Sequence, residues 1–531
     1  MADNHGEGGT FALSAMLLGD GALTPAVSVL SAIEGVAVEA PQLSSWVVPI
    51  SIIIIVLLFL AQRWGTSRIG VTFGPIMVCW FITLFIIGVW RITYKPSIFK
   101  AFNPWEAFHY LLVEKTRGFY QIGGVYLSVT GLEALYADLG HFGRWPVRAA
   151  WFFIVFPGVL FNYLGQGALL IADPSLVDNP FYHSVPEWFH WPMVVLATVA
   201  TIIASQAIIT GSFSLVSQAI GMECSVPVKI YHTSKTIIGQ IYIPTINYIL
   251  MILTIIIVIG FGTNGSITSA YGVTVCTVMI FTTILYMCVM YYTWHKRWYM
   301  ILPFGLFLIV DGYTWASNAT KIPSGGWVAI VIATGFFIFG FCWFFGQLNL
   351  RRFLKIHTQT TSLHTLALRL AVVTPSVGCF LTNSTKHTPH VFENYLTRTN
   401  SVPQVIIFLR IEHIKSSTIE DEKRLTIKQY GESIFHLTAL YGYSENRIKP
   451  FDILTLARTR FNLPIPNNES KITIFTPDET IKVSTVGWAS WIRRWPLYIY
   501  AILKSLYPGT SVNIKLAPEN TISIGILAKL K

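Results

Sequence analysis

Charged residues are scarce in this chain, and its few cysteines form no cluster. Asp, Glu, Lys and Arg together make up 12% of the 531 residues, whereas ordinary soluble domains contain about 25%. The six cysteines are scattered, with no CxxC pair and no histidine partners at metal-ligand spacing. We therefore expect them to be small apolar residues inside helices. No cleavable signal peptide is apparent, because Met1 leads directly into the polar run 2–7.

The chain contains many long apolar runs. Hydrophobic residues make up 53% of the chain, and ten segments approach the roughly 20 residues that a helix needs to cross a bilayer. The pattern predicts a polytopic α-helical membrane protein. The predicted segments are 11–36, 46–62, 69–93, 118–138, 145–171, 191–220, 242–262, 270–294, 299–316 and 324–348.

The last third of the chain differs in charge and in pattern. Residues 1–348 hold 14 basic and 14 acidic residues, whereas residues 349–531 hold 23 and 12. We therefore expect a membrane domain at 1–348 and a cytosolic domain at 349–531. A basic domain suits an anionic inner membrane leaflet. Nucleic-acid binding is the alternative, but no recognition motif accompanies the charge.

The order of predicted elements after residue 348 is typical of a small α/β domain. We expect strands at Val402–Ile414, Ser433–Leu440 and Lys471–Thr476, and helices at Pro450–Phe461 and Gly487–Leu506. The last helix is rich in tryptophan and arginine. It would either lie on the membrane interface or pack on its own domain, and we favour packing.

The basic residues between the segments predict the topology. If the first segment starts inside, the inner connections carry eleven Lys or Arg and the outer ones six, as the positive-inside rule favours. Both termini are then cytosolic. Asn264-Gly-Ser and Asn318-Ala-Thr fall in outer loops and match the glycosylation pattern, which is common by chance.

The first apolar segment contains an acidic residue, Asp20, within the run Gly19–Ala26. A carboxylate in hydrocarbon is costly unless it is paired, hydrated or neutralised, and it therefore indicates a functional site. Glycine and proline beside it free backbone oxygens, which are tolerated where they line a cavity. This combination suggests a path for cations.

For Asp311 we expect pairing or helix-end solvation. Other polar residues in the apolar segments could form hydrogen bonds between helices: Asn162, Gln166, Ser205 and Gln206.

Several strings, spread over the membrane part, resemble the KUP/HAK/KT family of potassium uptake transporters. They are ADNHGEGGTFAL at 2–13, GDGALTPAVSVLSA at 19–32, TGLEALYADLGHFG at 130–143, LGQGALL at 164–170, IASQA at 203–207, GQIYIP at 239–244 and AYG at 270–272. The resemblance implies an inverted-repeat transporter core of the LeuT/APC type, two added helices and a cytosolic tail. It also implies inward transport of potassium, usually with protons.

The resemblance also assigns roles to residues. Thr130 and Glu133 lie one turn apart in a helix that contains Gly123, Gly124 and Gly131 and that resembles the family's broken helix. Thr130 would be a potassium ligand, and Glu133 a ligand or proton carrier. Thr24 and Ser28 share one helix face and would line the same site. Asp20 is a weaker ligand candidate near the cytosolic gate, and Glu7 would act in gating at the inner mouth.

Relative to the family, the chain lacks two initial helices, the first of which carries half of the ion site. We therefore expect an N-terminal truncation, and the alternative to a transporter is a non-transporting remnant or a modulatory partner of a full-length homologue. We expect no enzymatic activity and no cofactor apart from the transported K⁺ and H⁺. The expected partners are these ions and the lipid bilayer. We expect a multi-pass protein of the plasma membrane. A homodimer stays open, and nucleic acid is not expected.

Overall fold

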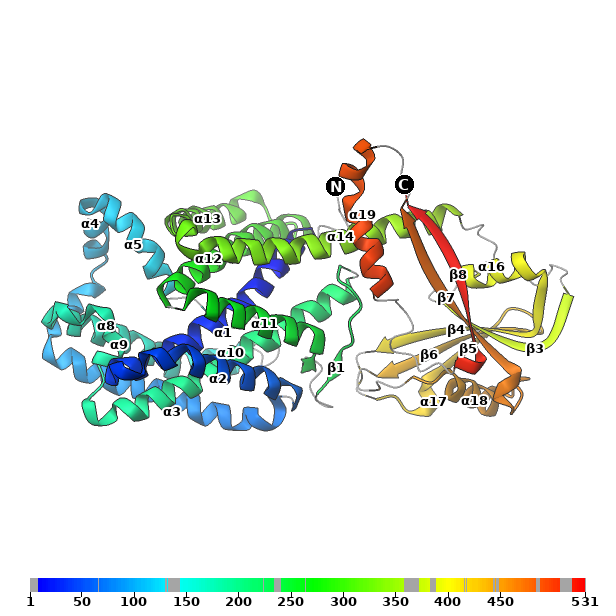
Figure 1. Ribbon diagram of the computed structural model, residues 1–531, viewed down its shortest axis with the longest axis horizontal. Coiled ribbons are helices and arrows are strands. Elements are labelled where there is room, and N and C mark those ends of the chain that lie inside the picture. The colour runs from blue at the N-terminus through cyan, green and yellow to red at the C-terminus, as the bar shows by residue number, and fades with distance from the viewer. Residues whose placement is uncertain are drawn as a thin grey trace. The chain divides into compact units, whose positions relative to one another are not determined.

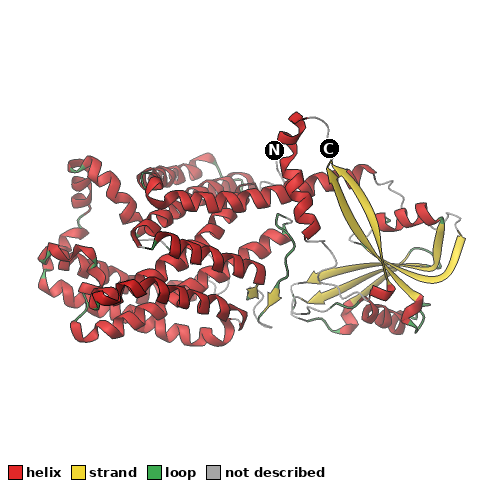
Figure 2. Cartoon of the chain, in the orientation of Figure 1, coloured by secondary structure: helices red, strands yellow, loops and turns green. Residues whose placement is uncertain are grey.

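The computed structural model describes residues 8–64, 66–128, 131, 144–222, 224–233, 240–262, 264–357, 372–382, 388–414, 416, 418–442, 445, 448–483, 488–506 and 518–530 (Figure 1). The chain divides into two compact units. The first comprises residues 1–218 and 239–338, and the second comprises residues 219–238 and 339–531. Figure 2 shows that the first unit is almost entirely helical, whereas the long strands belong to the second.

The helices of the first unit follow the apolar segments of the sequence. Their bounds are α1 Gly8–Glu39, α2 Val47–Ala61, α3 Thr66–Tyr94, α4 Pro104–Val113, α5 Lys115–Leu127, α7 Arg144–Ala150, α8 Phe156–Ala172, α9 Pro180–His183, α10 His190–Gly221, α11 Pro244–Phe261, α12 Asn264–Cys288, α13 Trp298–Ala319 and α14 Trp327–His357. α10 and α14 each continue past the end of the first unit. A short strand, β2 Ile241–Tyr242, precedes α11.

Nine stretches of the described residues are long and apolar enough to cross a membrane. They are Ser14–Glu39, Pro41–Trp64, Thr72–Tyr94, Trp145–Ala172, Glu187–Gly221, Pro244–Phe261, Ile267–Thr293, Trp298–Ala319 and Ile322–Leu354. Each corresponds to one predicted segment, which confirms a polytopic helical membrane protein. The tenth predicted segment, 118–138, lies partly outside the described residues, and α5 is its described part.

α3 and α8 approach closely because glycines face the contact. A Cβ added at Gly88 of α3 would collide with the backbone of Phe161 in α8, and a Cβ at Gly165 would lie 2.7 Å from the Cα of Gly88. A Cβ added at Gly158, near the start of α8, would lie 2.8 Å from the carbonyl oxygen of Phe81. Small residues commonly allow membrane helices to pack in this way, because lipid supplies no hydrophobic drive for association.

The second unit contains a six-stranded sheet of order β5-β6-β4-β3-β7-β8. All neighbouring pairs are parallel except β5 with β6. The elements are β1 Tyr231–His232, β3 Val372–Leu381, α16 His390–Thr399, β4 Ser401–Ile414, α17 Asp421–Arg424, β5 Leu425–Gln429, β6 Ile434–Gly442, α18 Pro450–Phe461, β7 Ile472–Val483, α19 Trp488–Leu506 and β8 Thr521–Leu530. Across the sheet, the five parallel strands lie in the order β6, β4, β3, β7, β8. Numbered by their order in the chain, this is 3-2-1-4-5, as in doubly wound α/β sheets.

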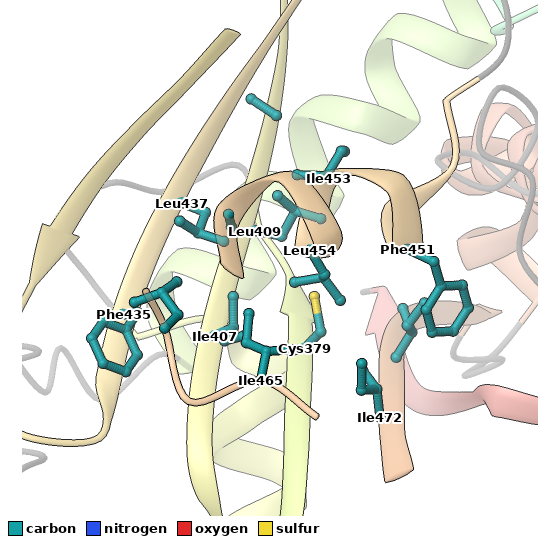
Figure 3. Packing of buried hydrophobic residues seen from close by; sticks show 14 of the residues in the cluster. Cys379, Ile407, Leu409, Phe435, Leu437, Phe451, Ile453, Leu454, Ile465 and Ile472 are labelled. Atoms are coloured by element: carbon teal, nitrogen blue, oxygen red, sulfur yellow. The ribbon is translucent and has the colours of Figure 1, made fainter. Parts of the chain in front are cut away.

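Both faces of this sheet are covered, so its central strands are apolar in consecutive positions. Cys379, Ile407 and Leu437 point to the face that α18 covers (Figure 3). Phe380 and Phe408, the next residues along, point to the other face and contact Phe392 of α16. The predicted α/β domain is confirmed, and the helix expected at Pro450–Phe461 has these bounds in the structure.

An ion pair supports one edge of the sheet. The guanidinium of Arg424 donates to both carboxylate oxygens of Glu445, at 2.8 and 3.3 Å, and lies over the ring of Tyr441. The same carboxylate accepts from the backbone N–H of Gly442 at 2.7 Å. These bonds to Glu445 raise the pKa of Arg424 above its usual value. Because Arg424 is largely buried, the carboxylate is needed to compensate its charge.

α19 packs within the second unit, as favoured from the sequence. Leu497 and Tyr500 are buried against Trp343 and Leu350, which lie in the part of α14 that belongs to this unit. The Tyr500 ring sits directly on Gly346, where a Cβ would collide with it. Leu497 and Tyr500 therefore face protein within this unit.

The cysteines differ in part from the expectation. All six are free, and four of them lie in α3, α12 and α14 as expected. Cys224 lies outside the helices, and Cys379 lies in the central strand β3. Full burial raises the pKa of the Cys379 thiol to about 12, since a thiolate cannot be solvated there.

Candidate ion-binding site

α1 is the helix of the first unit that is most enclosed by protein. More than half of its membrane-spanning window, 56%, is buried, compared with 11% for α13. α1 is helical from Gly8 to Glu39 although it contains Pro25. Proline has no N–H, so the carbonyl of Gly21 has no helical donor. The sequence feature that suggested a cation path thus lies in the interior of the helical unit.

The three polar residues predicted on α1 share one face. Asp20, Thr24 and Ser28 follow one another at intervals of four residues, which places them in a row along the helix. The row rises about 12 Å from Asp20 to Ser28. Asp20 is 2% exposed, and Ser28 is partly buried. The structure therefore brings these three predicted residues onto one buried stripe.

The hydroxyl of Thr24 stands out from other hydroxyls in the membrane helices. Its oxygen is buried and has no hydrogen-bond partner within the described part of the chain. Thr274, Thr282 and Thr198 instead donate to the carbonyl four residues earlier in their own helices, at 2.8 to 3.0 Å. A buried polar group without a partner carries a cost of about 1–3 kcal/mol. A ligand that binds oxygen would remove this cost.

Neighbouring helices add polar groups close to this part of α1. Thr254 of α11 donates to the carbonyl of Ala22 at 3.1 Å. Gly21 faces Ser212 of α10 so closely that a Cβ would collide with the hydroxyl. Ser205 and Gln206, about two turns earlier on α10, are also buried. Hydroxyls of α10 and α11 therefore lie against this part of α1, and buried polar groups in membrane helices point to functional sites.

The remaining predicted residues lie outside the described part of the chain. They are Thr130, Glu133 and Glu7. Two observations bear on the helix that was expected to contain Thr130 and Glu133. α5 ends at Leu127, and Gly131 has a φ of 111°, which an α-helix cannot accommodate. The helix of α5 therefore does not run through Gly131, in the segment for which the resemblance implied a broken helix.

The end of α5 is bonded to α8. The hydroxyl of Tyr163 in α8 donates to the carbonyl of Ser128, the residue that follows α5. Carbonyls at a helix end lack helical partners, and this bond satisfies one of them. No signal in the sequence pointed to Tyr163.

Three predictions about other polar residues have clear outcomes. Asn318 is not a glycosylation site in a loop, because it lies in α13 with no exposed surface. Asp311 is paired, as expected, and accepts from the Thr283 hydroxyl at 2.7 Å. Asn162 does not bond between helices through its carbonyl oxygen, which accepts from Gln166 of the same helix at 2.6 Å.

A carboxylate and hydroxyl oxygens on a buried stripe offer the ligands that alkali-metal cations and protons require. Sequence comparison is consistent with this chemistry. The family described as "K+ potassium transporter integral membrane domain" matches residues 14–348, and the family described as "K+ potassium transporter C-terminal domain" matches residues 375–530. The chain belongs to this potassium transporter family.

Curated relatives align along most of the transporter. "Probable potassium transport system protein Kup 1" of Chromobacterium violaceum is 36% identical over 561 aligned positions, which cover 100% of this chain and 86% of the relative. The protein of the same name from Geobacter sulfurreducens is 37% identical, covering 99% and 86%. "Probable potassium transport system protein Kup" of Cupriavidus pinatubonensis is 39% identical, covering 84% and 74%. Asp20, Thr24, Ser28, Thr130 and Glu133 all fall inside the matched membrane region.

Proposed function

We propose that this chain is a potassium uptake transporter that moves K⁺ inward together with protons. The observation that carries the proposal is the buried stripe Asp20–Thr24–Ser28 on α1, with a Thr24 hydroxyl that lacks a partner in the described part of the chain. Family membership supports potassium as the cargo. Thr130 and Glu133 would complete the site from the interrupted helix that follows α5.

The physical requirement is that oxygens of the protein replace the water around K⁺. Broken helices supply such oxygens near the bilayer midplane in secondary transporters. Inward movement of one positive charge gains about 2.3 kcal/mol per 100 mV of inside-negative potential. Proton coupling would add to this driving force, and Glu133 is the proposed carrier. An inverted-repeat core, with α13 and α14 as the added helices, is the architecture that we propose around this site.

Uptake of rubidium tests the proposal. Cells that lack their own potassium uptake would express the chain, and initial rates would be measured over a range of rubidium concentrations. Thr24→Val keeps the size of the side chain but removes the ligand oxygen, and we expect the apparent KM to rise about tenfold, equivalent to roughly 1.4 kcal/mol. Thr274→Val is the matched control, because the Thr274 hydroxyl is buried but bonds to its own helix.

Proton coupling has a separate test. In proteoliposomes without a membrane potential, an inward proton gradient should accelerate uptake by the wild-type chain and should have no effect on Glu133→Gln. If the proton gradient accelerates uptake by Glu133→Gln as much as by the wild type, Glu133 has no part in proton coupling. Absence of uptake by the wild type, despite normal amounts in the membrane, would contradict transport itself.

We further propose that the protein resides in the plasma membrane with both termini in the cytosol. The excess of Lys and Arg in the inner connections supports this orientation. A reporter domain that is active only in the cytosol should be active when it is fused at either end of the chain. The same reporter inserted in the 172–190 connection should be inactive.

A further inference from the structure

α13 contacts α5 through the backbone of one glycine, Gly123. The N–H of Gly123 donates to the Ser317 hydroxyl at 3.1 Å, and the Gly123 carbonyl accepts from the Asn318 side-chain nitrogen at 3.4 Å. Ser317 and Asn318 are both fully buried. Adjacent residues of one helix thus bond the donor and the acceptor of a single residue in another.

The contact extends along both helices with a regular spacing. One turn before Gly123, the ring of Phe119 packs edge-on against Tyr313 of α13, with centroids 5.3 Å apart. The Ser317 hydroxyl lies 3.5 Å from the carbonyl of Tyr120. Four-residue steps on each helix therefore stay in register, which fixes α5 both along its axis and about it.

α12 also contacts the junction formed by Gly123, Ser317 and Asn318. The Asn318 nitrogen lies 3.1 Å from Sγ of Cys276, and a Cβ at Gly272 would lie 2.7 Å from the Asn318 carbonyl oxygen. At Gly123 an added Cβ would be 2.8 Å from both Ser317 Oγ and Asn318 Nδ2. The amide of Asn318 is therefore held in a slot between two glycines, one on α5 and one on α12.

We propose that Ser317 and Asn318 are positioning residues for transport, because they hold α5 by its backbone at Gly123. α5 ends at Leu127, and Thr130, Gly131 and Glu133 follow within six residues of the sequence. This inference rests on the proposed function. It gives α13, which lies outside the proposed inverted-repeat core, a direct part in setting the geometry of the ion site.

The test separates positioning from simple structural support. Rubidium uptake would be measured for Asn318→Ala, Ser317→Ala and Gly123→Ala, with Thr274→Val as the control, at matched amounts of protein in the membrane. The thermal midpoint of each purified full-length variant would be measured in parallel, with and without K⁺. We expect Asn318→Ala and Gly123→Ala to raise the apparent KM at least fivefold and to lose most of the K⁺-induced rise in midpoint.

A compensating pair makes the test specific for the slot. Gly272→Ala pushes a methyl group against the Asn318 amide and should raise KM on its own. Combined with Asn318→Ala, the added methyl group enters the space that the amide leaves, so the double variant should be less impaired than the product of the two single effects. Such non-additivity is expected for residues in contact and not for distant, independent sites.

Two results would overturn the inference. One is a lower thermal midpoint in Asn318→Ala with an unchanged KM, which would make the junction structural only. The other is additive behaviour of Gly272→Ala and Asn318→Ala. If the wild type does not transport at all, the proposed function fails, while the additivity of the thermal midpoints still tests the junction.

Discussion

The two units of the chain solve the problem of close packing in different ways. In the second unit large aromatic and aliphatic side chains fill the interior, with Phe380, Phe392 and Phe408 all fully buried. In the first unit many large apolar side chains are exposed on the protein surface, such as Ile53 and Leu57 of α2, because lipid surrounds them. There, glycines allow the close approach of α3 and α8, at Gly88 and Gly165.

This difference shows what hydrophobicity reports in each environment. In the α/β unit an apolar residue in a strand indicates the core, because burial from water stabilises it by about 25 cal/mol per Å². In the membrane unit an apolar residue indicates only that a segment spans the bilayer. There, the residues that identify contacts are small or polar, since these bring backbones together or require partners.

The largest expected effect is in the core of the α/β unit. Phe380 stacks on Phe475 with centroids 4.4 Å apart and packs edge-on against Phe392. Phe380→Ala should destabilise this unit by about 3–5 kcal/mol, through lost burial and the cavity left behind. Pulse proteolysis of the full-length protein in urea would measure the loss of the folded unit. Ile522→Ala, at a half-exposed position on β8, should change the midpoint little.

The glycine contact of the membrane unit gives the opposite case, in which adding atoms destabilises. Gly88→Ala should force α3 and α8 apart and cost about 1–3 kcal/mol. Gly305→Ala on α13 is the matched control, since no atom lies within 4 Å of the added Cβ, and alanine favours the helix. Thermal midpoints in detergent should fall for the first variant and stay equal or rise for the second. A similar fall in both would contradict the close contact.

A smaller effect should come from the buried thiol of β3. The pKa of Cys379 is raised to about 12, whereas the unfolded thiol ionises near 8.5. Above that pH the unfolded state loses its proton first, so stability should fall as pH rises, by roughly 1 kcal/mol at pH 9.5. The burial of Tyr441, which raises its pKa, acts in the same direction.

Cys379→Ala isolates the contribution of the thiol. The variant should start less stable at pH 8 but should lose less stability than the wild type between pH 8 and pH 9.5. Equal losses, measured by pulse proteolysis in urea, would show that the thiol is not buried as described.

The sequence predicted the elements with strong local signals. Pro450 at the first turn and Asn462, which adopts a φ of 50° at the end, mark the bounds of α18. β3 was not predicted, because it contains Pro375 and Gly378, and proline argues against a central strand. The structure accommodates it with an irregularity in the pairing with β4 between Thr374 and Val377.

The sequence predicted the part of the candidate site whose residues lie on a single helix, because spacing along one helix shows which residues share a face. The spacing of Asp20, Thr24 and Ser28 predicted a shared face, and the structure adds that Thr24 has a buried hydroxyl. Asn318 matched a glycosylation pattern by its letters. Its contact with Gly123 joins residues 195 positions apart, and no local pattern encodes such a pairing.

The packing of Tyr500 against Gly346 determines where the C-terminal part can be cut from the rest of the chain for biochemical work. A fragment that begins at residue 349 would retain Tyr500 and Leu497 but lose Trp343 and Gly346, leaving an aromatic and aliphatic stripe of α19 open to water. A fragment that begins at Phe339 would keep the stripe covered but would carry the end of the last membrane span, Ile322–Leu354. Soluble expression of the C-terminal part should therefore require either detergent or polar replacements on α19.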